Sequence, residues 1–197
     1  LYHLAVPRMF VEQHRFVVVP TIAQASFPFT VEMLYTLCLL FGSEAGAALL
    51  HLSFGLLTAL AIWSFAARSC STRAGWFAVA AFLSASEVTH WAPAADIDLA
   101  LACYCFLSLY AIFAWLSGRQ SAMLVLGAAL AGIALGIKYT AAATLVVLLL
   151  LVLCADGWQP RRLWRAIMPA CAVAAVALLV ASPWYIKNLL IFHNPFY

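Results

Sequence analysis

Charged residues are scarce in this sequence, and acidic ones are the scarcest. Only 9% of the 197 residues are charged, and only seven residues are Asp or Glu. A water-soluble domain has about 25% charged and about 45–50% apolar residues, whereas this chain is 67% hydrophobic. The shortage of charge therefore excludes a chain folded around one core in water, and it predicts a polytopic membrane protein.

The sequence also lacks the motifs of common soluble enzymes. It has no glycine-rich phosphate loop followed by Lys and Ser or Thr, no His-Glu-x-x-His and no Gly-x-Ser-x-Gly. Its six cysteines are scattered without histidine partners at metal-ligand spacing, so we expect buried apolar residues rather than a metal centre or a disulfide framework. No metal ligand is predicted, and a divalent metal as cofactor stays open. A net charge of +3 is too small to indicate nucleic-acid binding.

Residues 1–43 are predicted to form an external region with two short helices. Residues 1–12 have the amphipathic pattern of an interfacial helix, and 31–41 form a second helix that ends at Gly42 and Ser43. Helices of about 12 and 11 residues are too short to cross a bilayer, which takes about 20. We therefore expect both helices to lie along the outer interface, joined by a loop.

Residues 44–197 are predicted to form one domain, an all-α transmembrane helical bundle with about six spans. The predicted spans are 44–67, 74–90, 99–116, two short halves of 121–154, and 167–186 with a break or bend at Pro183. The stretch 121–154 is also compatible with a single helix, but that helix would be about 51 Å long against a bilayer core of about 30 Å. A turn at 136–140 divides it instead.

The positions of the basic residues favour this turn. With it, six of the ten basic residues lie on the cytoplasmic side, and the other four lie outside: Arg8, Arg15, Lys138 and Lys187. Without it, the cluster in 161–165 lies outside and Lys138 stays within the membrane. The turn also places 159–165 at the cytoplasmic interface and all acids except Asp156 on the outer face. The polar chemistry is therefore expected on the non-cytoplasmic side.

Two acids, Asp96 and Asp98, stand where the third predicted span begins. An ionisable group at the edge of a bilayer is costly and by default suggests a functional site. The alternative is helix capping, which suits Asp96 better than Asp98. Residues two apart on a helix point about 200° apart, so at most one of the two can face a cleft formed with the first loop. Both are candidate catalytic residues; we expect the charge of Asp98 to matter and Asp96 mainly to cap the helix.

Basic side chains predicted on the same face complete a candidate site for a substrate with phosphate and hydroxyl groups. The candidate phosphate-binding residues are Arg8, Lys138, His3 and Lys187. Simpler interpretations remain open, since Lys138 can mark a helix turn by extending to the interface and Arg8 can belong to the polar face of its helix. His51, in mid-span, is interpreted as a helix–helix hydrogen bond rather than a ligand.

Five phrases follow one another in an order that belongs to a known family. They are Tyr2-His-Leu-Ala-Val-Pro-Arg8, 27–35 (FPFTVEMLY), Asp98-Leu-Ala, 132–140 (GIALGIKYT), and 182–188 (SPWYIKN) with 194–197 (NPFY). Together they resemble the GT-C superfamily of polytopic glycosyltransferases, in particular the bacterial branch related to protein O-mannosyltransferases and the aminoarabinose transferase of lipid A. Asp98 matches the family's second acidic position. The first catalytic acid of the family usually precedes the Tyr-His-Leu phrase, so we expect the natural chain to be longer.

The resemblance implies an enzyme of the bacterial inner membrane that transfers a sugar from a polyprenyl-phosphate donor on the periplasmic or extracellular face. Its partners would be the lipid-linked sugar donor and membrane lipids, and no nucleic acid. The alternative is a non-catalytic subunit with the same fold that serves as a scaffold in a larger membrane complex. A small transporter is a third interpretation, and acids at one face rather than at mid-membrane argue against it.

Overall fold

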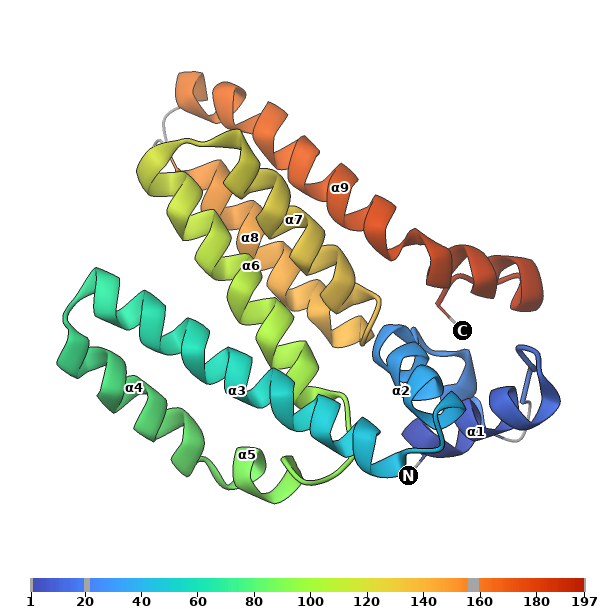
Figure 1. Ribbon diagram of the computed structural model, residues 1–197. Coiled ribbons are helices and arrows are strands. Elements are labelled where there is room, and N and C mark those ends of the chain that lie inside the picture. Colours follow the sequence, from blue (N-terminus) through green and yellow to red (C-terminus); the bar gives the residue numbers. More distant parts are fainter. Residues whose placement is uncertain (1, 20–21, 156–159, 197) are drawn as a thin grey trace. The chain divides into compact units, whose positions relative to one another are not determined.

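The computed structural model describes residues 2–19, 22–155 and 160–196, and all regular secondary structure in these ranges is helical (Figure 1). The predicted all-α fold is confirmed. The chain divides into two compact units, Leu1–Cys103 and Tyr104–Phe196. In chain order the elements are α1 Tyr2–Gln13, the 3₁₀ helix η1 Ala23–Ser26, α2 Thr30–Leu40, α3 Glu44–Ser69, α4 Thr72–Ser84, α5 Ser86–Trp91, α6 Asp98–Gly118, α7 Ser121–Leu135, the 3₁₀ helix η2 Tyr139–Ala141, α8 Ala142–Cys154 and α9 Pro160–Phe192.

The first unit begins with the two short helices expected in residues 1–43. α1 has 12 residues and α2 has 11, and the two pack against each other. α2 ends because Gly42 takes a left-handed conformation with φ of 72°, which lets its N–H donate to Leu39 and the Ser43 N–H donate to Cys38. The Ser43 hydroxyl then accepts from the Gly46 N–H and starts α3. The location of α1 and α2 at an outer membrane interface stays a prediction.

The predicted second span, 74–90, is wrong as a single helix. α3 and α4 lie side by side after a turn in which the Ser71 hydroxyl caps α4 (Figure 1). α4 then stops at Ala85, which is extended with ψ of 126°, and α5 follows. The Ser84 and Thr89 hydroxyls bond nearby backbone carbonyls on either side of this break. Hydroxyls that compete for backbone groups in this way disfavour a continuous helix.

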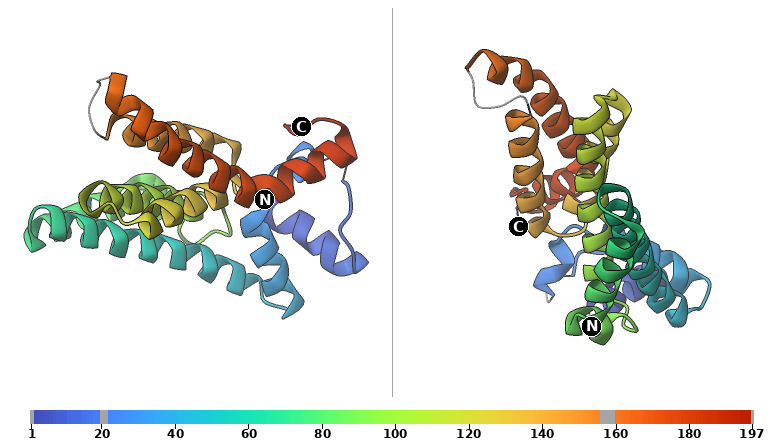
Figure 2. Two further views of the ribbon diagram at one scale, coloured as in Figure 1. Left: turned by 90° about the horizontal axis from the view of Figure 1, so that it is seen from above. Right: turned by 90° about the vertical axis from the view of Figure 1, so that its left-hand side faces the viewer.

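The second unit contains the rest of α6 with α7, α8 and α9. The predicted turn in 121–154 is confirmed, because α7 ends at Leu135 and Lys138 is extended before η2 and α8. α8 runs back beside α7, and α9 lies along both (Figures 1 and 2). α9 is continuous through Pro183, and both figures show it changing direction rather than breaking.

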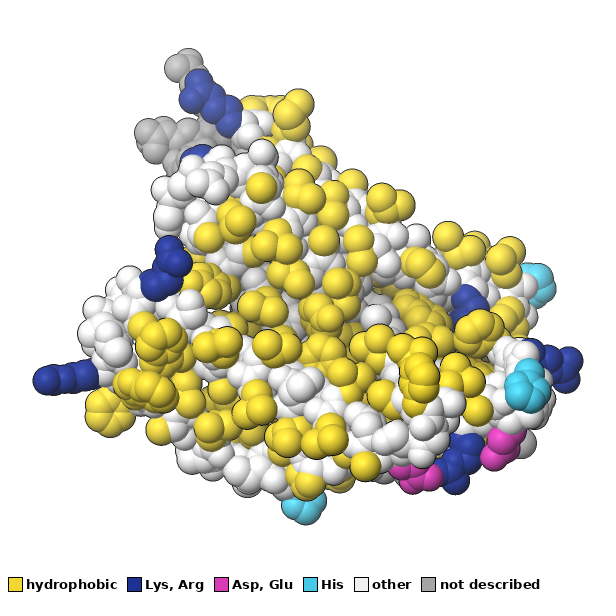
Figure 3. Space-filling model, viewed as in Figure 1, with side chains coloured by type: hydrophobic (Ala, Val, Ile, Leu, Met, Phe, Trp, Pro, Cys, Tyr) yellow, Lys and Arg dark blue, Asp and Glu magenta, His cyan; other side chains and the backbone are white. Residues whose placement is uncertain are grey.

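Three helices in the described residues have the length and composition of membrane spans: Glu44–Ser69, Asp98–Gly118 and Trp164–Phe192. Three others, Thr30–Leu40, Ser121–Leu135 and Tyr139–Cys154, are apolar but shorter. Apolar side chains cover the outside of the long helices in Figure 3, as expected for surfaces that face lipid. The structure thus supports a membrane protein, whereas six crossings and the sidedness of each loop stay predictions. Asp156 and Gln159, from the predicted cytoplasmic segment, lie outside the described residues.

Candidate functional site

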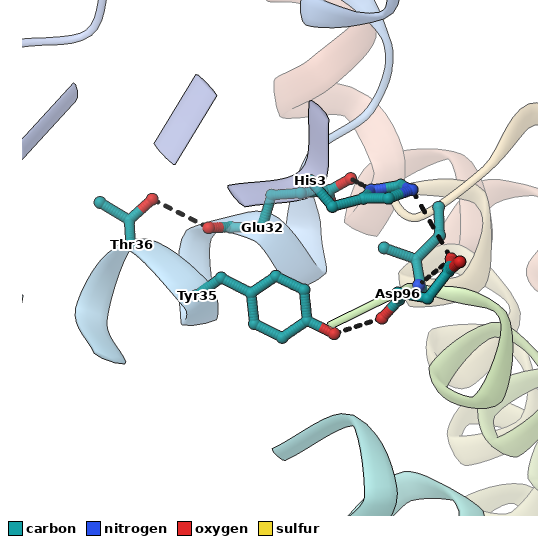
Figure 4. A network of polar contacts seen from close by, with 6 residues as sticks. His3, Glu32, Tyr35, Thr36 and Asp96 are labelled. Atoms are coloured by element: carbon teal, nitrogen blue, oxygen red, sulfur yellow. Dashed lines mark hydrogen bonds and ion pairs between the residues drawn. The ribbon is translucent and has the colours of Figure 1, made fainter. Parts of the chain in front are cut away.

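A buried acid, Glu32, is the centre of the polar structure in the first unit. It lies in the first turn of α2, an otherwise apolar helix, and only 1% of its surface is exposed. A buried carboxylate is costly unless a cation or a hydrogen-bond donor faces it. Its Oε1 lies 2.8 Å from Nδ1 of His3, which α1 brings to the same interior (Figure 4). The packing of α1 on α2 therefore pairs two residues 29 positions apart.

His3 connects Glu32 to Asp96. The Nε2 atom of the His3 ring lies 3.6 Å from Oδ1 of Asp96, on the side of the ring opposite Glu32 (Figure 4). This distance is too long for a hydrogen bond but short enough for an ion pair. His3 itself is 5% exposed, and Tyr2 lies against its ring with centroids 3.9 Å apart. Glu32, His3 and Asp96 thus form a line of alternating acid, base and acid, which we call the Glu32–His3–Asp96 network.

The backbone around Asp96 is held by neighbours on both sides. The Tyr35 hydroxyl donates to the Asp96 carbonyl, and the Asp96 carboxylate accepts from the Ile97 N–H at 2.6 Å. Leu99 is the residue after Asp98. Its N–H donates a hydrogen bond at 3.2 Å to the buried Nε2 of His51. The loop that leads into α6 is therefore fixed from α2 and from α3.

Two expectations about the start of α6 are settled by these contacts. His51 makes an interhelical hydrogen bond, as interpreted from the sequence. Asp96, in contrast, precedes the helix and does not cap it, because its carboxylate bonds the adjacent Ile97 N–H and faces His3. The two acids are not residues of one helix, so the argument that they point about 200° apart does not apply. Asp98 is the first residue of α6, and its side chain is exposed.

Burial and negative charge change the acid–base properties of the groups around the network. Burial raises the pKa of Glu32 above its ordinary value, and the hydrogen bond and charge of His3 oppose this only in part. Burial, followed by the charges of Glu32, Asp96 and Asp98, raises the pKa of Tyr2 to about 12. Burial also raises the pKa of Tyr35, with Glu32 and Asp96 adding to the effect. The site is therefore poorly hydrated and anionic, and its tyrosines stay protonated at neutral pH.

The predicted phosphate-binding residues lie in different parts of the chain. Arg8 pairs with Glu44, and both side chains are about half exposed. Lys138 precedes η2, and the Lys187 ammonium lies 5.6 Å from the centre of the Trp184 ring. These two lysines belong to the second unit, where Asn188 donates to the Tyr139 hydroxyl at 3.0 Å and so brings the adjoining segments together.

Sequence reasoning missed Glu32 and Tyr35 as site residues. Both lie in the phrase FPFTVEMLY, which carried part of the family resemblance. The available signal was a lone carboxylate inside an apolar helix, since α2 has no other charged residue. No cluster of three or more His, Cys, Asp or Glu side chains in the described ranges is arranged to hold a metal ion.

Comparison with known proteins identifies a family. A model of the dolichyl-phosphate-mannose-protein mannosyltransferase family matches residues 17–186, which is most of the chain. The match begins after α1, the helix that supplies His3 and Arg8. Comparisons with curated proteins and with solved structures find no match. On the extent of the family match, and in agreement with the GT-C resemblance of its sequence, the chain belongs to the dolichyl-phosphate-mannose-protein mannosyltransferase family.

Proposed function

We propose that this protein is a membrane glycosyltransferase that moves a sugar from a polyprenyl-phosphate donor to an acceptor hydroxyl on the non-cytoplasmic face of the bacterial inner membrane. The observation that carries the proposal is the buried Glu32–His3–Asp96 network beside the first turn of α6, a candidate span. Family membership supports sugar transfer by a membrane protein. A lipid-linked donor and a water-soluble acceptor meet at the end of a span, which is where an ionisable site is useful.

Asp98 is the residue that we assign as general base. It is exposed in the first turn of α6, at the positive end of the helix dipole. In the proposed step, the acceptor oxygen bonds to the anomeric carbon of the sugar while Asp98 accepts the hydroxyl proton. The bond from that carbon to the phosphate oxygen breaks, and its electron pair leaves with the phosphate. Asp96, held by Ile97 and facing His3, anchors the loop that places Asp98.

Cations are needed to neutralise the phosphate that leaves, and we propose Arg8, which lies in the same unit as Asp98, for this role. The Arg8 side chain is half exposed, so it can exchange its surface partner Glu44 for a phosphate at little cost. Lys138 and Lys187, in the second unit, flank the Tyr139–Asn188 hydrogen bond, so we propose that they bind a phosphate group as a pair. His3 is less suited to bind phosphate than first expected, because two carboxylates already face its ring.

The test is sugar transfer by the natural full-length protein in proteoliposomes. The probes are polyprenyl phosphates that carry radiolabelled mannose, glucose or aminoarabinose, offered with a membrane extract as the source of acceptors. We expect one of these donors to lose its label to the acceptor fraction, and Asp98→Asn to lower that rate by about 10²-fold or more. Glu12→Gln is the matched control, since Glu12 is an exposed acid of α1 outside the network.

The competing function is a non-catalytic scaffold. It predicts no transfer from any donor by the wild-type protein, together with purification in a fixed ratio with other membrane subunits. That pair of results would overturn the proposal. A wild-type rate that Asp98→Asn leaves unchanged would keep the transferase and reject Asp98 as its base.

A further inference from the structure

We infer that Glu32 is a positioning residue, which acts through His3 to hold Asp96 and with it the loop that presents Asp98. The inference rests on the proposed function, in which Asp98 is the base. It assigns to a buried acid of α2 a role in a site at the start of α6. Glu32 makes no direct contact with Asp96 in the structure; the His3 ring lies between them (Figure 4).

The first step of the argument is that Glu32 has one strong partner. Its Oε1 faces His3 at 2.8 Å, whereas its Oε2 is buried without a hydrogen-bond partner in the part of the chain that the structure describes. Thr36 bonds the backbone carbonyl of Glu32 and not its carboxylate. If Glu32 only filled space in an apolar helix, replacing it with an apolar residue would increase the stability of the fold. The reason is that a buried carboxylate with one oxygen unpaired is destabilising. Its contact with His3 is therefore the feature that a function would use.

The second step is a count of protons on the His3 ring. A neutral imidazole has one N–H, but carboxylate oxygens face both of its nitrogens. When the Glu32–His3 pair holds one extra proton, on the ring or on Glu32, Nε2–H can point at Asp96 and attract it. When that proton is lost, the one remaining ring proton stays on Nδ1 and donates to Glu32. The lone pair of Nε2 then faces the Asp96 carboxylate. The pair therefore holds Asp96 in one protonation state and releases it in the other.

The third step is that few other groups near the pair can titrate in its place. The ionisable side chains around it are Tyr2 on α1, Tyr35 on α2, His51 on α3, Asp96 in the loop and Asp98 on α6. The raised pKa of Tyr2 and of Tyr35 removes both from the neutral range. His51 already accepts from the Leu99 N–H, a bond that the uncharged ring satisfies. The proton that decides the contact with Asp96 is thus assigned to the Glu32–His3 pair, whose atoms face each other and Asp96.

The kinetic test compares Glu32→Gln with His3→Gln, the double variant and the control Glu12→Gln, all in the full-length protein. Glutamine keeps the size of Glu32 but cannot take up or release the extra proton of the Glu32–His3 pair. We expect Glu32→Gln to lower kcat by about 10-fold or more, with KM for the donor within about 2-fold, because the base is misplaced while donor binding remains. The alkaline limb of its pH–rate profile should move to lower pH. The double variant should lose no more than the worse single variant.

Three kinetic results would overturn the inference: an unchanged pH profile in Glu32→Gln, losses that multiply in the double variant, or an effect on KM alone. A second measurement does not depend on activity. In protein labelled with ¹⁵N-histidine, with the His3 signal identified by its absence in His3→Gln, the Nε2 atom of His3 should keep its proton to a higher pH in wild type than in Glu32→Gln. Equal titrations would reject the positioning role. If His3 titrates differently in wild type and in Glu32→Gln but the wild-type protein transfers no sugar, only the proposed function is rejected.

Discussion

The Nε2 atom of His51, a residue of the N-terminal half of α3, accepts a hydrogen bond at 3.2 Å from the backbone N–H of Leu99 in the first turn of α6. The first N–H groups of a helix have no partner within the helix, and a buried one must find a partner elsewhere. His51 is fully buried, so this bond is shielded from water and ties the start of α6 to α3. Asp96, in the loop, and Asp98, the first residue of α6, lead up to this bond.

Replacing His51 should therefore weaken the first unit. His51→Leu fills similar space but leaves the Leu99 N–H without an acceptor, so we expect it to cost about 1–3 kcal/mol. His51→Gln, which keeps an acceptor oxygen, should cost less. The measurement is the thermal unfolding temperature in detergent. Ser53→Ala is the control, because the Ser53 hydroxyl bonds only within its own helix. An unfolding temperature of His51→Leu equal to that of the control would contradict the assigned bond.

The stability that Glu32 contributes should fall as pH rises. Burial raises the pKa of Glu32 in the folded protein above 4.5, so the folded state holds this proton more tightly than the unfolded chain does. The linked stabilisation is complete below that pH and is lost as pH rises through the folded value. Because Gln does not titrate, the unfolding temperature of wild type minus that of Glu32→Gln should decrease with rising pH. If this temperature difference instead grows with pH, the pKa of Glu32 is lowered, not raised, in the folded protein.

The contact between α7 and α9 should tolerate no side chain at Gly132. A Cβ there would lie 2.5 Å from the Ala177 carbonyl oxygen and 2.7 Å from Cβ of Val180. Gly132→Ala should push the helices apart and cost about 1–3 kcal/mol. At Gly118 the nearest atom to such a Cβ is 3.9 Å away, so Gly118→Ala is a matched control with little expected effect. Equal unfolding temperatures for the two variants would rule out the close approach of the helices.

The turn between α7 and α8 should be reachable from the non-cytoplasmic side. The basic residues favour this sidedness, and the turn itself is present with Lys138 extended before η2. Lys138→Cys, introduced after the native cysteines are replaced, should react with a membrane-impermeant maleimide added to intact cells. Reaction only after permeabilisation would place the turn inside and reject the predicted six crossings.

Sequence reasoning succeeded where local signals are strong. Gly42 marks the end of α2 because glycine alone adopts its positive φ at no cost, and Gly136 lies in the turn that divides 121–154. The break at Ala85 was missed, since neither Gly nor Pro marks it and the hydroxyls that favour it also occur within helices.

The site was predicted only in part, because its contacts are not local. Asp96, Asp98 and His3 were named from charge in apolar surroundings, but the role of Asp96 depends on a ring that α1 delivers from 93 positions earlier. No periodicity in α2 shows that Glu32 meets His3, since that pairing requires α1 to pack on α2. Tyr35 was missed for the same reason, as its hydroxyl reaches a backbone carbonyl 61 positions away.

The central claim is that sugar transfer uses the Asp98 carboxylate, presented by a loop that Asp96 anchors. The most direct test is kcat for transfer by Asp98→Asn and Asp96→Asn in the full-length protein, measured side by side. We expect Asp98→Asn to lose about 10²-fold or more, the range for a general base. Asp96→Asn should lose about 10-fold, because Asn still accepts from the Ile97 N–H but carries no charge toward His3. Full activity in both variants, or a larger loss in Asp96→Asn than in Asp98→Asn, would contradict the claim.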